Sequence, residues 1–190
     1  MSNNQKFLAF AAVALLALGA VYFISIKKPF DNNKSQTQNQ SAAAANITTE
    51  EKNFADWKVV CSKNNDTKKT SCVAQQIITV KQEEKDVPIA TYQFMYGEKK
   101  ELKLIQILPQ GLLLSAGTSV IAADKILAPG KFTICQAQGC VAVSDVSKED
   151  LAVILSAEKV SIAVLDANGK QANIVMSVKG LTEALEEIKK

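Results

Sequence analysis

The chain has 190 residues, a length that suits one domain with additional segments. All 22 basic residues are Lys and there is no His, so the sequence lacks the bidentate Arg clamp for phosphate and the commonest general base and metal ligand. From Asn46 onward 18 Lys balance 18 acidic residues. A neutral domain argues against a nucleic-acid-binding protein, which usually carries a basic face.

An N-terminal apolar run covers Phe7 to Ile26, which is 20 residues without charge or Pro. About 20 apolar residues are enough to cross the hydrocarbon core as a helix, so residues 1–30 are predicted to be a membrane anchor. The alternative is a cleaved signal peptide, because residues 17–19 (Ala-Leu-Gly) place small side chains where a signal peptidase reads them. The apolar run continues past that point, which favours retention as a single-pass inner-membrane helix with the domain in the periplasm.

Residues 31–53 are rich in Asn, Gln, Ser and Ala and contain little that a core could bury. Such a composition predicts a flexible polar linker. A coil of this length spans on the order of 25 Å, so the linker is expected to hold the domain away from the bilayer. The folded domain is predicted to cover residues 54–190.

Short runs of strand-forming residues, separated by turn signals, recur through this domain. They cover Trp57–Cys61, Cys72–Val80, Ile89–Tyr96, Leu102–Leu108, Ser119–Ala123, Lys131–Cys135, Cys140–Val146, Val160–Leu165 and Gln171–Val178. The pattern is typical of an antiparallel sandwich or barrel. A turn is expected at residues 109–111 (Pro-Gln-Gly) and a break at residues 128–130 (Ala-Pro-Gly), because Pro cannot donate to a central ladder and Gly permits positive φ.

Two helices and one hairpin have local signals. Ser147 with Asp150 resembles a weak capping box before apolar residues at helical spacing, which predicts one short helix. Residues 181–188 place their apolar side chains on one face, and this predicts a C-terminal helix over the sheet edge or core. Asn168 and Gly169 tolerate positive φ and predict a tight hairpin between the last two strands.

The aromatic residues Tyr92, Phe94 and Tyr96 alternate along one predicted strand and therefore share one of its faces. Core packing is the expected role of these side chains. A ligand-binding aromatic stripe is the alternative.

The four Cys fall into two close pairs, Cys61 with Cys72 and Cys135 with Cys140. Behind an export segment, an even number of locally spaced Cys indicates disulfides, although four Cys allow three connectivities. We favour the two local pairs, each worth about 2 to 3 kcal/mol by loop-closure entropy. A four-Cys zinc site and a redox-active dithiol are the alternatives, but neither spacing matches the short C-x-x-C arrangements typical of those sites.

No group of residues stands out as catalytic. Without His the usual Ser or Cys triads cannot be assembled, and no motif supports a Ser/Lys dyad or a carboxylate pair. No glycine-rich phosphate loop is present in the sequence. The sequence therefore predicts a protein that is not an enzyme, with no cofactor and no metal site.

Several landmarks occur in a distinctive order: DWKVVC at residues 56–61, Cys72, IQILPQG at 105–111, FTICQAQGC at 132–140, VSDVS at 143–147 and IVMSVKGLTEALEEI at 174–188. This order resembles the invasion-associated locus B family of Gram-negative envelope proteins over nearly the whole soluble domain. The most specific parts are the two Cys ending in Gly-Cys, the Leu-Pro-x-Gly segment and the terminal Ser-x-x-Gly. Leu181 departs from the family, in which an aromatic residue commonly follows that glycine, and this affects local packing.

The resemblance implies an immunoglobulin-like β-sandwich, an envelope location and an association of some members with host-cell invasion, but no catalytic residue. The leading hypothesis is an anchored periplasmic protein that acts as a binding or envelope-support module for an unknown protein or envelope partner. A secreted or surface-delivered host-contact factor is the second hypothesis, and it requires removal of the N-terminal segment. A thiol-dependent enzyme or periplasmic redox chaperone is the third.

Overall fold

The computed structural model describes residues 46–189. The predicted transmembrane segment, Phe7–Ile26, and most of the predicted linker lie outside the described residues. Within residues 46–189, no helix has both the length and the apolar character needed to cross a bilayer. The described part comprises the predicted domain and the end of the predicted linker.

The described chain is mostly β, as predicted. Its elements are β1 (Ile47–Phe54), β2 (Trp57–Asn64), β3 (Thr70–Gln82), β4 (Lys85–Tyr96), β5 (Leu102–Leu108), η1 (Leu114–Ala116), β6 (Thr118–Ala122), β7 (Lys125–Gln136), β8 (Gly139–Val146), α2 (Lys148–Ser156), β9 (Val160–Leu165), β10 (Gln171–Met176) and α3 (Leu181–Glu187). Neighbouring strands all run antiparallel, in the order β1-β2-β3-β4-β5-β8-β7-β6-β9-β10. The predicted short helix and C-terminal helix are both present.

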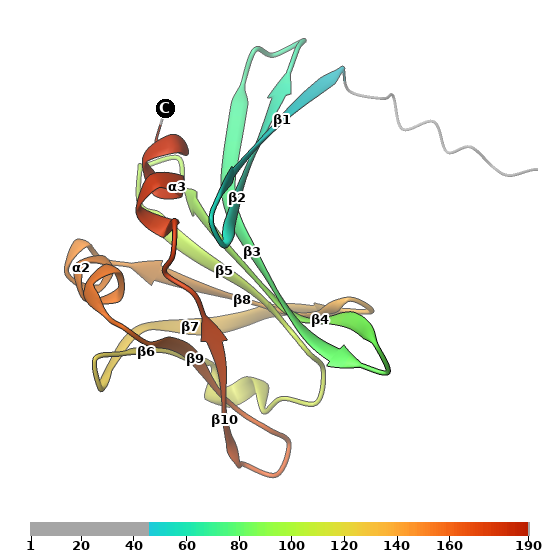
Figure 1. Cartoon of the computed structure of the whole chain (residues 1–190), viewed down its shortest axis with the longest axis vertical. Coiled ribbons are helices and arrows are strands. Elements are labelled where there is room, and N and C mark those ends of the chain that lie inside the picture. The colour runs from blue at the N-terminus through green and yellow to red at the C-terminus, as the bar shows by residue number, and fades with distance from the viewer. Residues whose placement is uncertain (1–45, 190) are drawn as a thin grey trace, which may run out of the picture. The chain divides into compact units, whose positions relative to one another are not determined.

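The strands form one continuous sheet, which corrects the expectation of an immunoglobulin-like sandwich with two separate sheets. β5 pairs directly with β8, so hydrogen bonds join the two halves of the domain. Figure 1 shows a strongly curled sheet. The last strand, β10, contacts β3, and Tyr92 on β4 donates a hydrogen bond to the Ile174 carbonyl on β10 at 3.2 Å. Strand twist accumulates across a long sheet and accounts for such a curl. The core fills the inside of this bent sheet.

The first strand corrects the predicted linker. β1 covers residues 47–54 and pairs with β2 from Ile47 opposite Asn64 to Phe54 opposite Trp57, so the linker prediction is wrong for residues 47–53. All of its residues except Phe54 are exposed. An edge strand with both faces in water needs no apolar alternation, because pairing with the neighbouring backbone holds it.

The break predicted at residues 128–130 is also wrong. β7 runs through Ala128 and Pro129, and its register against β6 shifts between Thr118 and Val120. An irregular register of this kind lets Pro stay within a strand. The turn lies earlier, at Ala123 and Asp124, whose φ angles of 47° and 58° occur without a Gly to signal them.

The aromatic side chains of β2 and β4 form the centre of the core. Trp57 is 1% exposed, and Tyr92 and Phe94 are fully buried. The Trp57 and Phe94 rings lie 5.5 Å apart between centroids in a tilted arrangement, which is favourable for aromatic pairs. Core packing, the role expected for the alternating aromatic residues, is confirmed for Tyr92 and Phe94 of β4.

We expect the buried Tyr92 phenol to make the domain less stable in alkali. Burial raises the pKa of Tyr92 above its ordinary value, so the unfolded chain releases this proton at a lower pH than the folded one. The protonated Tyr92 phenol contributes fully to the free energy of unfolding below about pH 10, the ordinary Tyr pKa. This contribution is lost as pH rises above that value. Urea unfolding of wild type and Tyr92→Phe at neutral and alkaline pH tests this.

The Tyr92→Phe protein should lose less stability between the two pH values than wild type does. All other residues are common to both proteins, so their contribution to the pH dependence cancels in the comparison. Equal pH dependence in the two proteins contradicts the assignment to Tyr92.

Candidate functional site

The Ser-x-x-Gly segment after β10, residues 177–180, has a structural role rather than that of a binding site. We call it the C-terminal clasp, because it holds the end of the chain against β2 and β3. Ser177 Oγ donates to Asp56 Oδ2 at 2.6 Å, the Ser177 backbone N–H donates to Gln76 Oε1 at 2.9 Å, and Trp57 Nε1 donates to the Ser177 carbonyl at 2.9 Å. Gly180 follows with a φ of 78°, and a Cβ there would overlap the Phe54 carbonyl oxygen. These contacts join the end of the chain to β2 and β3.

The Leu-Pro-x-Gly and Gly-Cys segments support each other in a second structural contact. Gln110 Nε2 donates to the Gln136 carbonyl at 2.9 Å. Gly139 lies so close to Leu108 that a Cβ would overlap the Leu108 carbonyl oxygen. Gly139 and Gly180 are therefore required for close packing of backbones, whereas Gly111 has open space around it and adopts a φ of 86°.

The predicted cysteine pairing is confirmed. Cys61 is bonded to Cys72 across β2 and β3, and Cys135 is bonded to Cys140 across β7 and β8. The four Cys therefore lie in two separate hairpins and do not come together as one zinc site. Within residues 46–189, no cluster of His, Cys, Asp and Glu side chains has an arrangement that could hold a metal ion.

A cleft at one end of the sheet is the strongest candidate for a functional site. Its floor is a row of side chains from three neighbouring strands: Tyr96 on β4 pairs with Leu102 on β5, and Leu102 pairs with Val146 on β8. Directly paired residues of antiparallel strands point to the same face. Strand register therefore builds an apolar floor from residues far apart in the sequence.

Two helices form the walls of this cleft. Leu151 comes from α2, which begins after the N-cap Ser147, whose side chain accepts a hydrogen bond from the Asp150 N–H at 2.9 Å. Ile188 follows α3 on the other side. The cleft has a volume of about 880 Å³ and is lined by Tyr96, Lys100, Glu101, Leu102, Asp145, Val146, Ser147, Lys148, Asp150, Leu151, Ile188 and Lys189.

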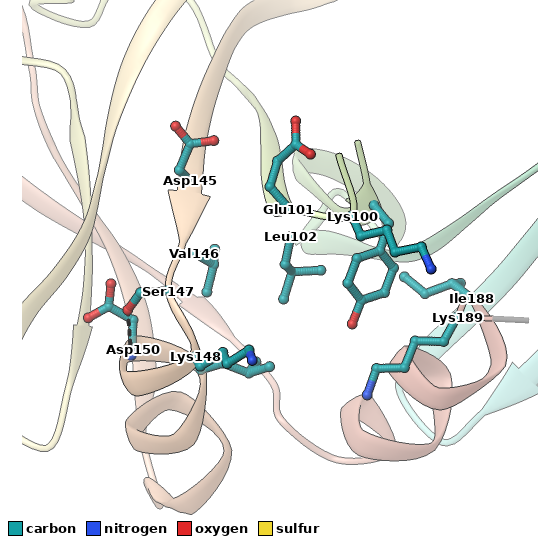
Figure 2. A pocket seen from close by; sticks show the side chains of 12 residues that line it. Lys100, Glu101, Leu102, Asp145, Val146, Ser147, Lys148, Asp150, Ile188 and Lys189 are labelled. Atoms are coloured by element: carbon teal, nitrogen blue, oxygen red, sulfur yellow. Dashed lines mark hydrogen bonds between the residues drawn. The ribbon is translucent and has the colours of Figure 1, made fainter. Parts of the chain in front are cut away.

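Charge is unevenly distributed around the cleft. Figure 2 shows Asp145 and Glu101 at one end and Lys148 and Lys189 at the other. Lys103 compensates the acidic end, because its Nζ lies 2.7 Å from Asp145 Oδ1 and 3.8 Å from Glu101 Oε1. The hydrogen bond to Asp145 raises the pKa of Lys103, as expected for an ammonium group beside a carboxylate.

The lysines at the other end form no such ion pair within the described chain, and Asp150 also lines the cleft on the Lys148 side (Figure 2). No ion pair among residues 46–189 involves Lys100, Lys148 or Lys189, and all three are exposed. A cleft with an apolar floor and ammonium groups at its rim is able to bind a ligand that has an apolar part and a negative charge.

Sequence reasoning missed this cleft. The only relevant local signals are the apolar residues at the ends of three strands and the cap at Ser147. Neither signal says that β5 lies between β4 and β8, and without this strand order Tyr96, Leu102 and Val146 cannot be placed in one row.

The fold and the cleft together define a class: a disulfide-bonded antiparallel β domain with an amphipathic cleft between its two helices. The sequence also matches the model of the family described as "Invasion associated locus B (IalB) protein" over residues 57–189. The chain belongs to the IalB family.

Named relatives agree with this assignment. Invasion protein B homologs of Brucella abortus, from strain 2308 and from biovar 1 strain 9-941, are each 28% identical over 153 residues, which is 78% of this chain and 86% of theirs. The crystal structure of invasion associated protein B from Bartonella henselae has a TM-score of 0.63 at 13% identity, covering 74% of this chain and 96% of that one. This last likeness establishes a shared fold.

Proposed function

We propose that this protein is a non-catalytic binding module of the bacterial cell envelope. In this proposal the apolar segment Phe7–Ile26 holds it in the inner membrane and the domain faces the periplasm. Its role is to bind or support an envelope component through the cleft, in a process connected with host-cell invasion. The cleft between α2 and α3 is the observation that carries the proposal.

The cysteines support the location. Both disulfides bridge paired strands, and such bonds form and persist in oxidising compartments such as the bacterial periplasm rather than in the cytosol. The uncharged 20-residue segment before the domain supports membrane attachment.

The chemistry of the cleft supports binding rather than catalysis. Its Asp145 is ion-paired with Lys103, and Leu102, Val146 and Ile188 form a largely buried apolar surface. The chain also has no His to act as a base. The connection with invasion is supported by family membership and by the names of the relatives.

Fractionation of cells that make the full chain tests the location. We expect the chain in the inner-membrane fraction at its full mass, with the domain degraded when protease is added to spheroplasts. An alkylating reagent added before reduction should label none of the four Cys. The Cys135→Ala variant provides the positive control, because it leaves the Cys140 thiol to react.

Protection of the domain from external protease, together with four reactive thiols, contradicts the proposal. A mature chain that lacks its first residues and occurs in the medium instead supports the second candidate, a secreted or surface-delivered host-contact factor. The names of the relatives, which are invasion protein B homologs, favour this candidate.

A further inference from the structure

We infer that the cleft between α2 and α3 binds a single-chain amphiphile with an anionic head group, its apolar chain on the floor and its head between Lys148 and Lys189. This inference rests on the proposed binding function and names the chemistry of its ligand. A carboxylate or a phosphate would satisfy the head-group site. Figure 2 shows Leu102 and Val146 on the floor, with Lys148 and Lys189 at one end of the cleft.

The floor favours a ligand whose chain carries no hydrogen-bonding groups. Tyr96, Leu102 and Val146 belong to three strands that are paired with one another at these positions. Leu102, at the centre of the floor, is paired on both sides, with Tyr96 and with Val146, so an extended peptide lying across it would find no free strand edge to pair with there. An acyl chain has no hydrogen-bonding groups and would lose only its contact with water.

The size of the cleft agrees with this ligand class. Its volume of about 880 Å³ falls within the range of about 300 to 1,000 Å³ that is typical of small-molecule sites. Leu102 and Val146 are each 7% exposed and Ile188 is 8% exposed. The apolar surface is therefore part of the packed domain rather than a loose flap.

The charges place the head group. Asp145 and Lys103 are paired one residue away from the floor row, and successive residues of a strand point to opposite faces. The Asp145 carboxylate is thus held by Lys103 on the other face and reaches the cleft only at its rim. Lys148 and Lys189 lie at the opposite end of the cleft (Figure 2), where their ammonium groups can bind an anion. Asp150 lies beside Ser147 on the Lys148 side, so the head group is placed between the two lysines rather than next to the N-cap of α2.

Photo-crosslinking to the full chain in phosphatidylcholine nanodiscs tests the inference. The probes are diazirine-bearing dodecanoate and dodecyl phosphate, with a diazirine-bearing dodecyl glucoside as the neutral comparison. We expect at least one anionic probe to label peptides that contain Leu102, Leu151 or Ile188. Excess dodecanoate without a diazirine should compete with the probe and lower this labelling. The head group that labels at the lower concentration identifies carboxylate or phosphate as the preferred source of charge.

Matched Lys variants separate the head-group site from general attraction to positive charge. The Lys148→Gln/Lys189→Gln variant should need about tenfold more anionic probe for the same labelling. The reason is that the charged hydrogen bonds from the two lysines to the head group are lost. Lys125→Gln/Lys131→Gln removes two exposed charges from β7, outside the cleft, and should label as wild type does. Circular dichroism spectra of all variants should be unchanged.

Three results overturn the inference: equal labelling by the neutral probe, equal effects of the two double variants, or adducts confined to other parts of the domain. Each is independent of the compartment in which the protein is found. A periplasmic, fully oxidised chain without cleft labelling therefore rejects the amphiphile and leaves the proposed envelope function standing.

Discussion

Replacing Trp57 by Ala should destabilise the domain by about 3 to 5 kcal/mol, the usual cost of removing a large aromatic side chain from a core. Trp57 is 1% exposed and packs against Phe94 at 5.5 Å between ring centroids. Its Nε1 also donates to the Ser177 carbonyl, so the truncation removes one bond of the C-terminal clasp. Against a typical stability of about 5 to 15 kcal/mol, this loss would leave a marginal protein. Urea unfolding followed by circular dichroism measures it.

Two further variants show whether the effect comes from this core position. Trp57→Phe keeps most of the aromatic surface and should lose less stability than Trp57→Ala. Lys63→Ala alters an exposed residue of the same strand and should stay within about 0.5 kcal/mol of wild type. A loss below about 1 kcal/mol for Trp57→Ala contradicts the view that β2 is fixed by this core contact and by the clasp.

Local sequence patterns predicted the elements whose own residues decide their structure. The bounds of β5 and β9 agree with the predicted Leu102–Leu108 and Val160–Leu165, because each strand alternates buried and half-buried positions. The hairpin that Asn168 and Gly169 predicted lies between β9 and β10, and Gly169 adopts a φ of 79° in it. The Ser147 cap is likewise formed.

The wrong predictions concern elements whose structure depends on contacts between distant parts of the sequence. β1 has no apolar face and is a strand only because β2 offers its edge. Pro129 stays inside β7 because the register against β6 is irregular there. One curled sheet and two stacked sheets require the same alternation in each strand, so only the pairing of β5 with β8 distinguishes them.

The candidate site was hidden for the same reason. Cys61, Cys72, Cys135 and Cys140 were recognised from their spacing, and the structure shows that they close two hairpins. Tyr96, Leu102 and Val146 look like ordinary core positions in the sequence. They line a cleft only because sheet order places their strands side by side at its base, between the two helices.

Removing the two disulfides separately should have unequal effects. The Cys61–Cys72 bond spans a sequence separation of 11 residues and the Cys135–Cys140 bond a separation of 5. The longer loop loses more entropy on closure in the unfolded chain, so Cys61→Ala/Cys72→Ala should cost about 3 kcal/mol and Cys135→Ala/Cys140→Ala about 2 kcal/mol. Denaturant unfolding of the two double variants and wild type measures the difference.

The order of these two losses tests the physical account. Cys140 is 3% exposed, Cys135 is exposed, and Cys61 and Cys72 are half-buried, so the largest loss of packing at a single position would be at Cys140. A larger loss for Cys135→Ala/Cys140→Ala therefore means that native contacts around Cys140, rather than loop closure, govern the contribution of this disulfide to stability.

The same variant also addresses the hypothesis of a thiol-dependent enzyme. If the Cys135–Cys140 bond has a structural role alone, labelling of the cleft by the anionic probe should survive while the domain stays folded. Loss of that labelling in a folded protein would assign the Cys135–Cys140 bond a direct part in function.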